Sequence, residues 1–138
     1  MMFPALAWTL LAPAAFVPAA EAMVLSCLPL RAKGEQQIEA YLDGFAAGAY
    51  PPQKIESIRV LARFGADVYE FFPSHTRQLE LRGDMLRIHL HQPLSAGTSA
   101  EMRFEGKLAA TKGGEFTMHF TLRNERRDGQ GDVRCTLE

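Results

Sequence analysis

The last third of the chain, residues 101–138, constrains the fold most strongly. It holds three runs in which apolar and polar side chains alternate, separated by glycine-containing turns. Alternation with a period of two is typical of strands that bury one face. In the final run, Val133, Cys135 and Leu137 share one face, so Cys135 is expected to point into a core. The segment therefore predicts three antiparallel strands.

The turns between these strands predict how the strands pair. A three-residue turn at Gly113–Glu115 sets Leu108 opposite Phe120 on the buried face. A turn over Arg126–Gly129 then sets Phe120 opposite Cys135. On the outer face the same registers place Glu105 opposite Arg123, Arg103 opposite Glu125, and Arg123 near Asp132.

Two further hairpins are expected upstream. A two-residue turn at Gly83–Asp84 brings apolar side chains together on one face and opposite charges together on the other. The predicted pairs are Leu81 with Leu86, Leu79 with Ile88, and Glu80 with Arg87. The second hairpin turns at Gly65–Asp67. Its arms, residues 57–64 and 68–72, are apolar on both faces, which is typical of strands inside a sandwich or beneath a loop.

The start of the domain adds two more strands. Residues 23–30 form a short apolar run that contains Cys27, and residues 37–44 alternate up to the turn pair Asp43-Gly44. A short helix over residues 35–49 is the alternative, and residues 44–52 are expected to be a loop. The whole pattern predicts an all-β fold, an antiparallel β-sandwich or small barrel of about eight strands.

Residues 1–22 have the composition of a signal peptide. Glu21 is their only charged residue, and the segment ends in Ala20-Glu21-Ala22, a pattern that signal peptidases cleave. Cleavage leaves a single domain over residues 23–138, with no stable membrane span. A retained N-terminal anchor is one alternative, and a lipoprotein modified at Cys27 is another. The leader predicts a periplasmic or secreted protein.

The two cysteines lie near opposite ends of this domain. Because an exported chain with an even number of cysteines is typically oxidised, a disulfide between Cys27 and Cys135 is expected. The sequence contains no Cys-x-x-Cys motif, so it gives no indication of a redox centre or a zinc site.

The charge balance limits the classes of partner. Fifteen basic and sixteen acidic side chains leave a formal charge of −1, which provides no bulk field for nucleic acid or an anionic membrane. A row of outward arginines is expected along one sheet face, without the exposed aromatic side chains that single-stranded nucleic acid requires. Its members are Arg59, Arg63, Arg82, Arg87, Arg103 and Arg123.

Motifs for catalysis are weak or missing in the sequence. No Gly-x-Ser-x-Gly elbow and no glycine-rich phosphate loop is present. Ser74 and His75 are neighbours on an expected turn, which favours hydrogen bonds to the backbone over a catalytic triad. Asp128 and Asp132 flank two glycines, but the turn lacks the further acids of a calcium loop. The sequence therefore predicts a protein that is not an enzyme and needs no cofactor.

One pair of histidines fits a metal site. His89 and His91 are two residues apart on an expected strand and so share one face. Such a pair can supply two ligands to zinc or copper. Solvent-facing histidines on a polar strand face are the simpler interpretation.

These features favour a binding or accessory module that acts on another exported protein or a small ligand. One alternative is an inhibitor of a secreted enzyme such as a lysozyme, for which the loop Pro93–Ser99 is the candidate contact. The other is a periplasmic metal-binding protein that uses His89 and His91. Fold alone does not decide among these.

Overall fold

A computed structural model describes residues 22–30 and 38–138 of the chain. The described residues form one antiparallel sheet of nine strands in the order β4-β3-β2-β1-β9-β8-β7-β6-β5. The strands are β1 (Ala22–Pro29), β2 (Ile38–Ala47), β3 (Ile55–Phe64), β4 (Asp67–Phe71), β5 (Thr76–Arg82), β6 (Met85–Pro93), β7 (Ser99–Lys107), β8 (Glu115–Arg123) and β9 (Asp128–Leu137). Two short 3-10 turns, η1 (Pro73–His75) and η2 (Ser95–Gly97), follow β4 and β6.

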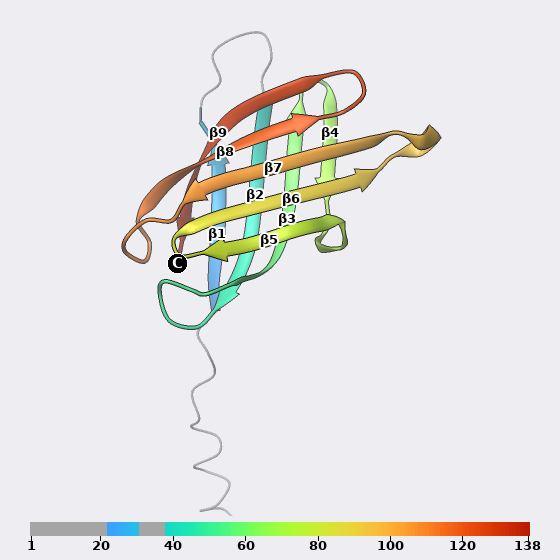
Figure 1. Cartoon of the computed structure of the whole chain (residues 1–138). Coiled ribbons are helices and arrows are strands. Elements are labelled where there is room, and N and C mark those ends of the chain that lie inside the picture. Colours follow the sequence, from blue (N-terminus) through green and yellow to red (C-terminus); the bar gives the residue numbers. More distant parts are fainter. Residues whose placement is uncertain (1–21, 31–37) are drawn as a thin grey trace, which may run out of the picture.

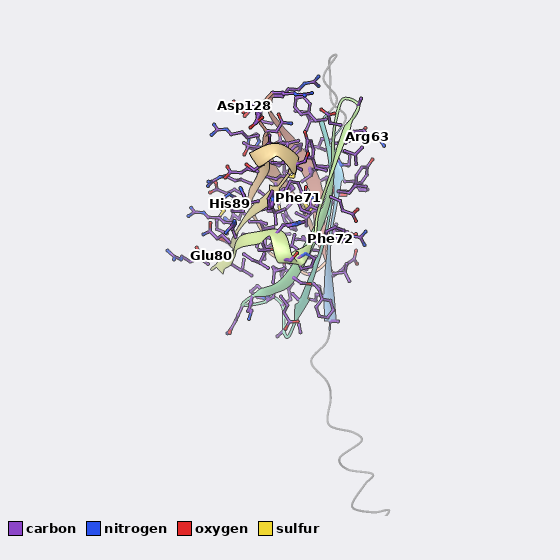
Figure 2. The ribbon with its side chains drawn as sticks, turned by 90° about the vertical axis from the view of Figure 1, so that its right-hand side faces the viewer. Arg63, Phe71, Phe72, Glu80, His89 and Asp128 are labelled. Atoms are coloured by element: carbon purple, nitrogen blue, oxygen red, sulfur yellow. A yellow bond between two sulfur atoms is a disulfide. The ribbon has the colours of Figure 1, made fainter. Side chains whose placement is uncertain are left out.

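The sheet forms two layers that cross at a steep angle. Strands β1–β4 make one layer and β5–β9 the other, and the pairing of β1 with β9 joins them (Figure 1). In the edge-on view Phe71 lies between the layers, whereas Arg63 and His89 point outward on opposite sides (Figure 2). The all-β, antiparallel prediction is confirmed, with nine strands instead of about eight. The choice between sandwich and barrel stays a prediction.

The core between the layers is apolar. Alternate side chains of every central strand are buried, and within the described residues no polar or charged side chain is buried with them. Its largest members include Phe64, Phe71, Phe104 and Phe120. Burying each phenyl ring contributes about 1.5–3 kcal/mol relative to leaving it exposed. The core therefore depends on the period-two pattern that the sequence shows.

The disulfide prediction is confirmed. Cys27 of β1 and Cys135 of β9 are directly paired across the two strands and are bonded to each other. Both side chains are buried. The bond therefore lies at the junction of the two layers.

One predicted register is correct and two are wrong. In the β5–β6 hairpin Leu79 pairs with Ile88, and the other two predicted pairs also form. In β7–β8 Phe104, and not Leu108, pairs with Phe120. In β8–β9 Cys135 pairs with Phe116 instead of Phe120. The outer pairs predicted from these registers are therefore also wrong.

Both errors are a shift by an even number of residues, so every side chain keeps its predicted face. Leu108 and Phe120 are buried as expected. The cause is the position of the turns. The β7–β8 connection begins before Gly113, and β9 already begins at Asp128 because the preceding turn is formed by residues 124–127.

The segment 38–47 is a strand, so the helix alternative is wrong there; residues 35–37 lie outside the described part. Asp43-Gly44 is not a turn, because β2 continues through it to Ala47. A Cβ atom on Gly44 would lie 2.6 Å from Cδ1 of Ile58 and 3.2 Å from Cβ of Leu25. Gly44 is therefore required by close packing and not by a turn.

The expected signal peptide lies almost wholly outside the described residues, since only Ala22 belongs to β1. Among the described residues, no helix has the length and apolar character needed to cross a membrane.

Candidate binding surfaces

His89 and His91 lie on β6 and share its outer face, as predicted, with buried Leu90 between them. Nε2 of His89 is 3.7 Å from Oε1 of Glu101. Nδ1 of His91 is 3.2 Å from a guanidinium nitrogen of Arg77. Each imidazole thus has its own neighbour on an adjacent strand.

The surroundings of His89 disfavour its charged form. Burial lowers the pKa of His89, and the positive charge of Arg103 lowers it further, while Glu101 acts in the opposite direction. Within residues 22–30 and 38–138, no three His, Cys, Asp or Glu side chains are grouped to hold a metal ion. Metal binding by His89 and His91 stays a prediction.

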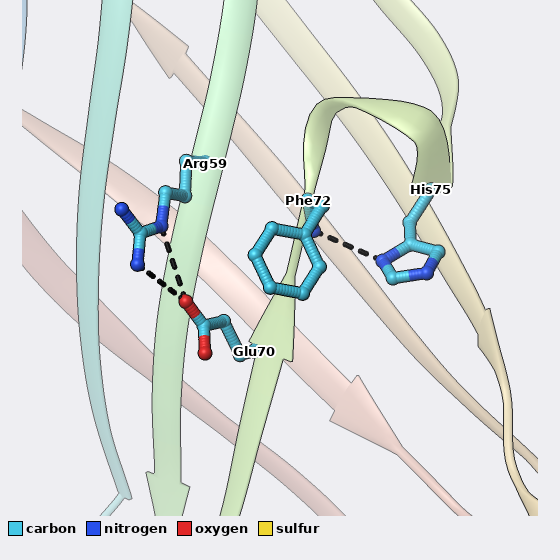
Figure 3. A network of polar contacts seen from close by, with 4 residues as sticks. All are labelled: Arg59, Glu70, Phe72 and His75. Carbon is cyan, nitrogen blue, oxygen red and sulfur yellow. Dashed lines mark hydrogen bonds and ion pairs between the residues drawn. The ribbon is translucent and has the colours of Figure 1, made fainter.

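Ser74 and His75 belong to η1, where the histidine has a structural contact. Nδ1 of His75 accepts a hydrogen bond from the backbone N–H of Phe72 at 2.9 Å (Figure 3). The imidazole therefore closes the turn between the two layers. Nearby, the guanidinium of Arg59 on β3 binds the carboxylate of Glu70 on β4.

Asp128 and Asp132 do not form a calcium loop. Both lie on the outer face of β9, where Asp128 binds Arg123 at 3.3 Å and Asp132 binds Nδ1 of His119 at 2.8 Å. Each carboxylate is directed to a separate cationic or polar partner on β8, so the two do not converge.

The predicted single row of arginines is wrong. Arg59 and Arg63 lie on the outer face of β3, whereas Arg87 and Arg103 lie on the outer face of the other layer. Figure 2 shows Arg63 and His89 pointing away from each other. Because the core separates the two groups, they cannot act as one surface.

The outward side chains of β5–β9 form a surface that we call the charged face. Its central row crosses five strands as Glu80, Arg87, Glu105, His119 and Asp132, each the cross-strand neighbour of the next. Arg87 and Glu105 form an ion pair at 3.3 Å. Acidic side chains thus alternate with a basic or an imidazole side chain along this row.

The outward side chains of β1–β4, with Phe72 directly after β4, form a different surface that we call the apolar face. Its large hydrophobic side chains are between 39% and 63% exposed. They are Val24, Leu28, Tyr41, Phe45, Leu61, Val68 and Phe72. The prediction that residues 57–72 are covered on both faces is therefore wrong within the described part of the chain.

Four of these apolar side chains form two cross-strand pairs. Val24 pairs with Phe45 across β1 and β2, and Tyr41 pairs with Leu61 across β2 and β3. The guanidinium of Arg59 lies 5.8 Å from the centre of the Phe72 ring. Large contiguous apolar patches on a soluble protein typically mark interaction sites.

The predicted contact loop, Pro93–Ser99, borders a depression of about 540 Å³. The β3–β4 turn and residues Asn124–Arg126 form its other sides. Within the loop, Oγ1 of Thr98 donates a hydrogen bond to the carbonyl of Ser95 at 3.0 Å. That hydroxyl group stabilises the loop itself.

No known family model, no curated protein and no solved structure matches this chain.

Sequence reasoning missed the apolar face, although its sign was present. The arms 57–64 and 68–72 are apolar on both faces in the sequence, and their second face, which holds Leu61 and Phe72, is exposed in the structure and not covered. The alternation of side chains along a strand shows which residues share a face of the sheet. It gives no information on whether another segment covers that face.

Proposed function

We propose that this chain is an exported binding module that docks onto another exported protein through the apolar face. The observation that carries the proposal is the segregation of the two outer surfaces. Neighbouring large hydrophobic side chains are exposed on β1–β4, while ion pairs populate β5–β9. Aromatic and arginine side chains such as Tyr41, Phe45 and Arg59 are enriched in protein interfaces.

The charges among the apolar side chains indicate the kind of partner. The face carries carboxylates at Glu39, Asp43, Glu56 and Glu70, and guanidinium groups at Arg59 and Arg63. Since Arg59 is bound to Glu70, three carboxylates are left against one guanidinium group. Two copies of this face would bring the same acidic excess together, as would contact with anionic lipid. The complementary partner is a protein surface with an apolar centre and basic residues at its rim.

The test is capture of a partner from periplasmic or culture extract by the intact protein, followed by calorimetry with the purified partner. We expect Leu61→Asp to weaken binding by at least about 2 kcal/mol, because it places a charge in the centre of a desolvated interface. Thr117→Asp, at an exposed position on the charged face, is the matched control.

Equal binding by the wild type and Leu61→Asp contradicts the proposal. A dimer of the wild type that Leu61→Asp converts to a monomer also contradicts it, because the apolar face then binds a second copy. Light scattering after size-exclusion chromatography distinguishes the two cases.

The two alternative functions make separate predictions. A lysozyme-type inhibitor is expected to bind its enzyme through Pro93–Ser99, so Leu61→Asp leaves that inhibition intact. A metal-binding protein is expected to take up zinc or copper through His89 and His91, and the double substitution to Ala removes the heat of binding in calorimetry.

A further inference from the structure

Arg103 occupies an unusual position at the centre of the charged face. It lies on β7, and its cross-strand neighbours are His89 on β6 and Thr121 on β8. The same row continues to Gln78 on β5 and Gln130 on β9. Arg103 is thus the one charged residue in a row of hydrogen-bonding side chains that crosses all five strands.

Most other arginines on the outer face of β5–β9 have a carboxylate partner, and Arg77 contacts His91 instead. Four arginines of this layer form ion pairs: Arg82 with Glu80 (3.5 Å), Arg87 with Glu105 (3.3 Å), Arg123 with Asp128 (3.3 Å) and Arg134 with Glu115 (3.8 Å). Within the described residues, the guanidinium of Arg103 forms no ion pair and no hydrogen bond. Five donor N–H groups are therefore available to a ligand.

Two acids flank Arg103 on its own strand. Glu101 and Glu105 flank Arg103 two residues away on the same face. Glu101 lies 3.7 Å from Nε2 of His89, and Glu105 is bound to Arg87. Their charges still act on any ligand that reaches Arg103, and they disfavour a ligand with two negative charges.

The surface is hollowed on both sides of Arg103. One depression of about 510 Å³ includes Thr121 and Gln130, and a second of about 190 Å³ includes Gln78 and His89. Arg103 and Thr121 line both. A ligand bound at Arg103 can therefore extend along the row in either direction.

His89 adds a polar atom that lacks a hydrogen-bond partner. Its Nε2 is shielded from solvent and forms no hydrogen bond within the described part of the protein. Such atoms are rare in native proteins and often mark an unfilled contact.

We propose that this row is a binding site for a small, singly charged carboxylate that also carries hydroxyl groups. The planar guanidinium of Arg103 binds the carboxylate through two parallel N–H···O bonds. His89, Thr121 and the two glutamines bind the hydroxyl groups. The flanking carboxylates make a monoanion a better ligand than a phosphate dianion.

The test uses the intact protein and D-glucuronate, a hydroxylated monocarboxylate, in an NMR titration of backbone amides. We expect shift changes centred on Arg103 and Thr121, with binding weakened roughly tenfold or more in Arg103→Gln. Arg134→Gln, which removes an equal charge from the same face at a position that lines neither depression, is the matched control and is expected to bind as the wild type does.

The outcomes are decisive in each direction. Glucuronate binding that Arg103→Gln loses and Arg134→Gln keeps supports the site. Equal binding of D-glucose shows that the carboxylate is irrelevant and overturns it, as does tighter binding of inorganic phosphate. Equal loss of binding in both variants overturns the proposal, because it shows a general effect of charge. The absence of any shift change in the wild type at high ligand concentration also overturns it. Because Arg103 is exposed, amide spectra of the variant confirm its fold independently.

Discussion

At the scale of single residues, Gly129 shows how closely the layers pack. A Cβ atom at this position would lie 2.2 Å from Cε2 of Phe64 and 2.5 Å from Cδ1 of Ile38. Since Phe64 is buried, its ring has little room to move. We expect Gly129→Ala to lower the free energy of unfolding by about 1–3 kcal/mol, measured by urea denaturation.

The neighbouring residue provides the control for this prediction. Gln130 is exposed on the opposite side of β9, and Gln130→Ala is expected to change stability by less than about 0.5 kcal/mol. A Gly129→Ala protein as stable as the wild type would show that Phe64 can shift without cost.

A second residue-scale prediction concerns pH and His89. Its pKa in the folded protein is lowered from 6.5, first by burial and then by Arg103. Between the lowered pKa of the folded state and the pKa of the unfolded chain, the unfolded chain therefore binds more protons than the folded protein. As the pH falls through this interval, the free energy of unfolding falls too. The contribution of neutral His89 to the free energy of unfolding is complete above the pKa of His89 in the unfolded chain. It is lost as the pH falls from there through the pKa in the folded protein. We expect His89→Gln to reduce the loss of unfolding free energy between about pH 7 and about pH 5; parallel curves for the two proteins would contradict this.

At the scale of elements, the β8–β9 turn depends on Asn124. Its side-chain oxygen accepts hydrogen bonds from the backbone N–H groups of Arg126 and Arg127, both at 2.8 Å. Its amide nitrogen donates to the hydroxyl of Tyr69 on β4. We expect Asn124→Ala to destabilise the fold by about 1–3 kcal/mol in thermal or urea denaturation, because three hydrogen bonds are lost. Glu125→Ala, one residue along the same turn, should leave the transition unchanged.

This turn also explains which parts of the fold the sequence could predict. The alternation around Phe120 and Cys135 fixes the faces of the strands, and a shift by an even number preserves them. The register depends on which residues form the turn: the sequence pattern favours residues 126–129, whereas the turn in the structure spans residues 124–127. The β5–β6 register was predictable because Gly83-Asp84 offers one short turn with matching pairs on both sides. Exposure of Leu61 depends on the whole assembly, which local patterns do not describe.

At the scale of the molecule, the disulfide joins the two layers. Cys27 and Cys135 are 108 residues apart in sequence, so their bond removes much conformational freedom from the unfolded chain. We expect reduction to lower the unfolding free energy by about 4–5 kcal/mol. Urea denaturation with and without a reductant measures this difference, and coincident midpoints would contradict it. The double substitution of both cysteines to alanine separates this effect from that of the reductant.

The pairing of β1 with β9 would allow the strands to follow one another in a different order along the chain. The backbone of Glu138 exchanges two hydrogen bonds with that of Val24, at 2.7 and 3.2 Å, so the start of β1 and the chain end are adjacent. A circular permutant that joins these ends and opens the chain at η1 would run β5 to β9 and then β1 to β4. Every strand would then pair with its neighbour in sequence.

Such a permutant keeps the sheet but lowers its contact order, which favours faster folding. With Glu138 joined directly to Ala22, the cysteines would close a loop of only roughly 10 residues, so the same bond would contribute about 2.7 kcal/mol instead of about 4.7 kcal/mol. The natural connectivity thus places the longest-range pairing of the sheet where the covalent bond stabilises it most.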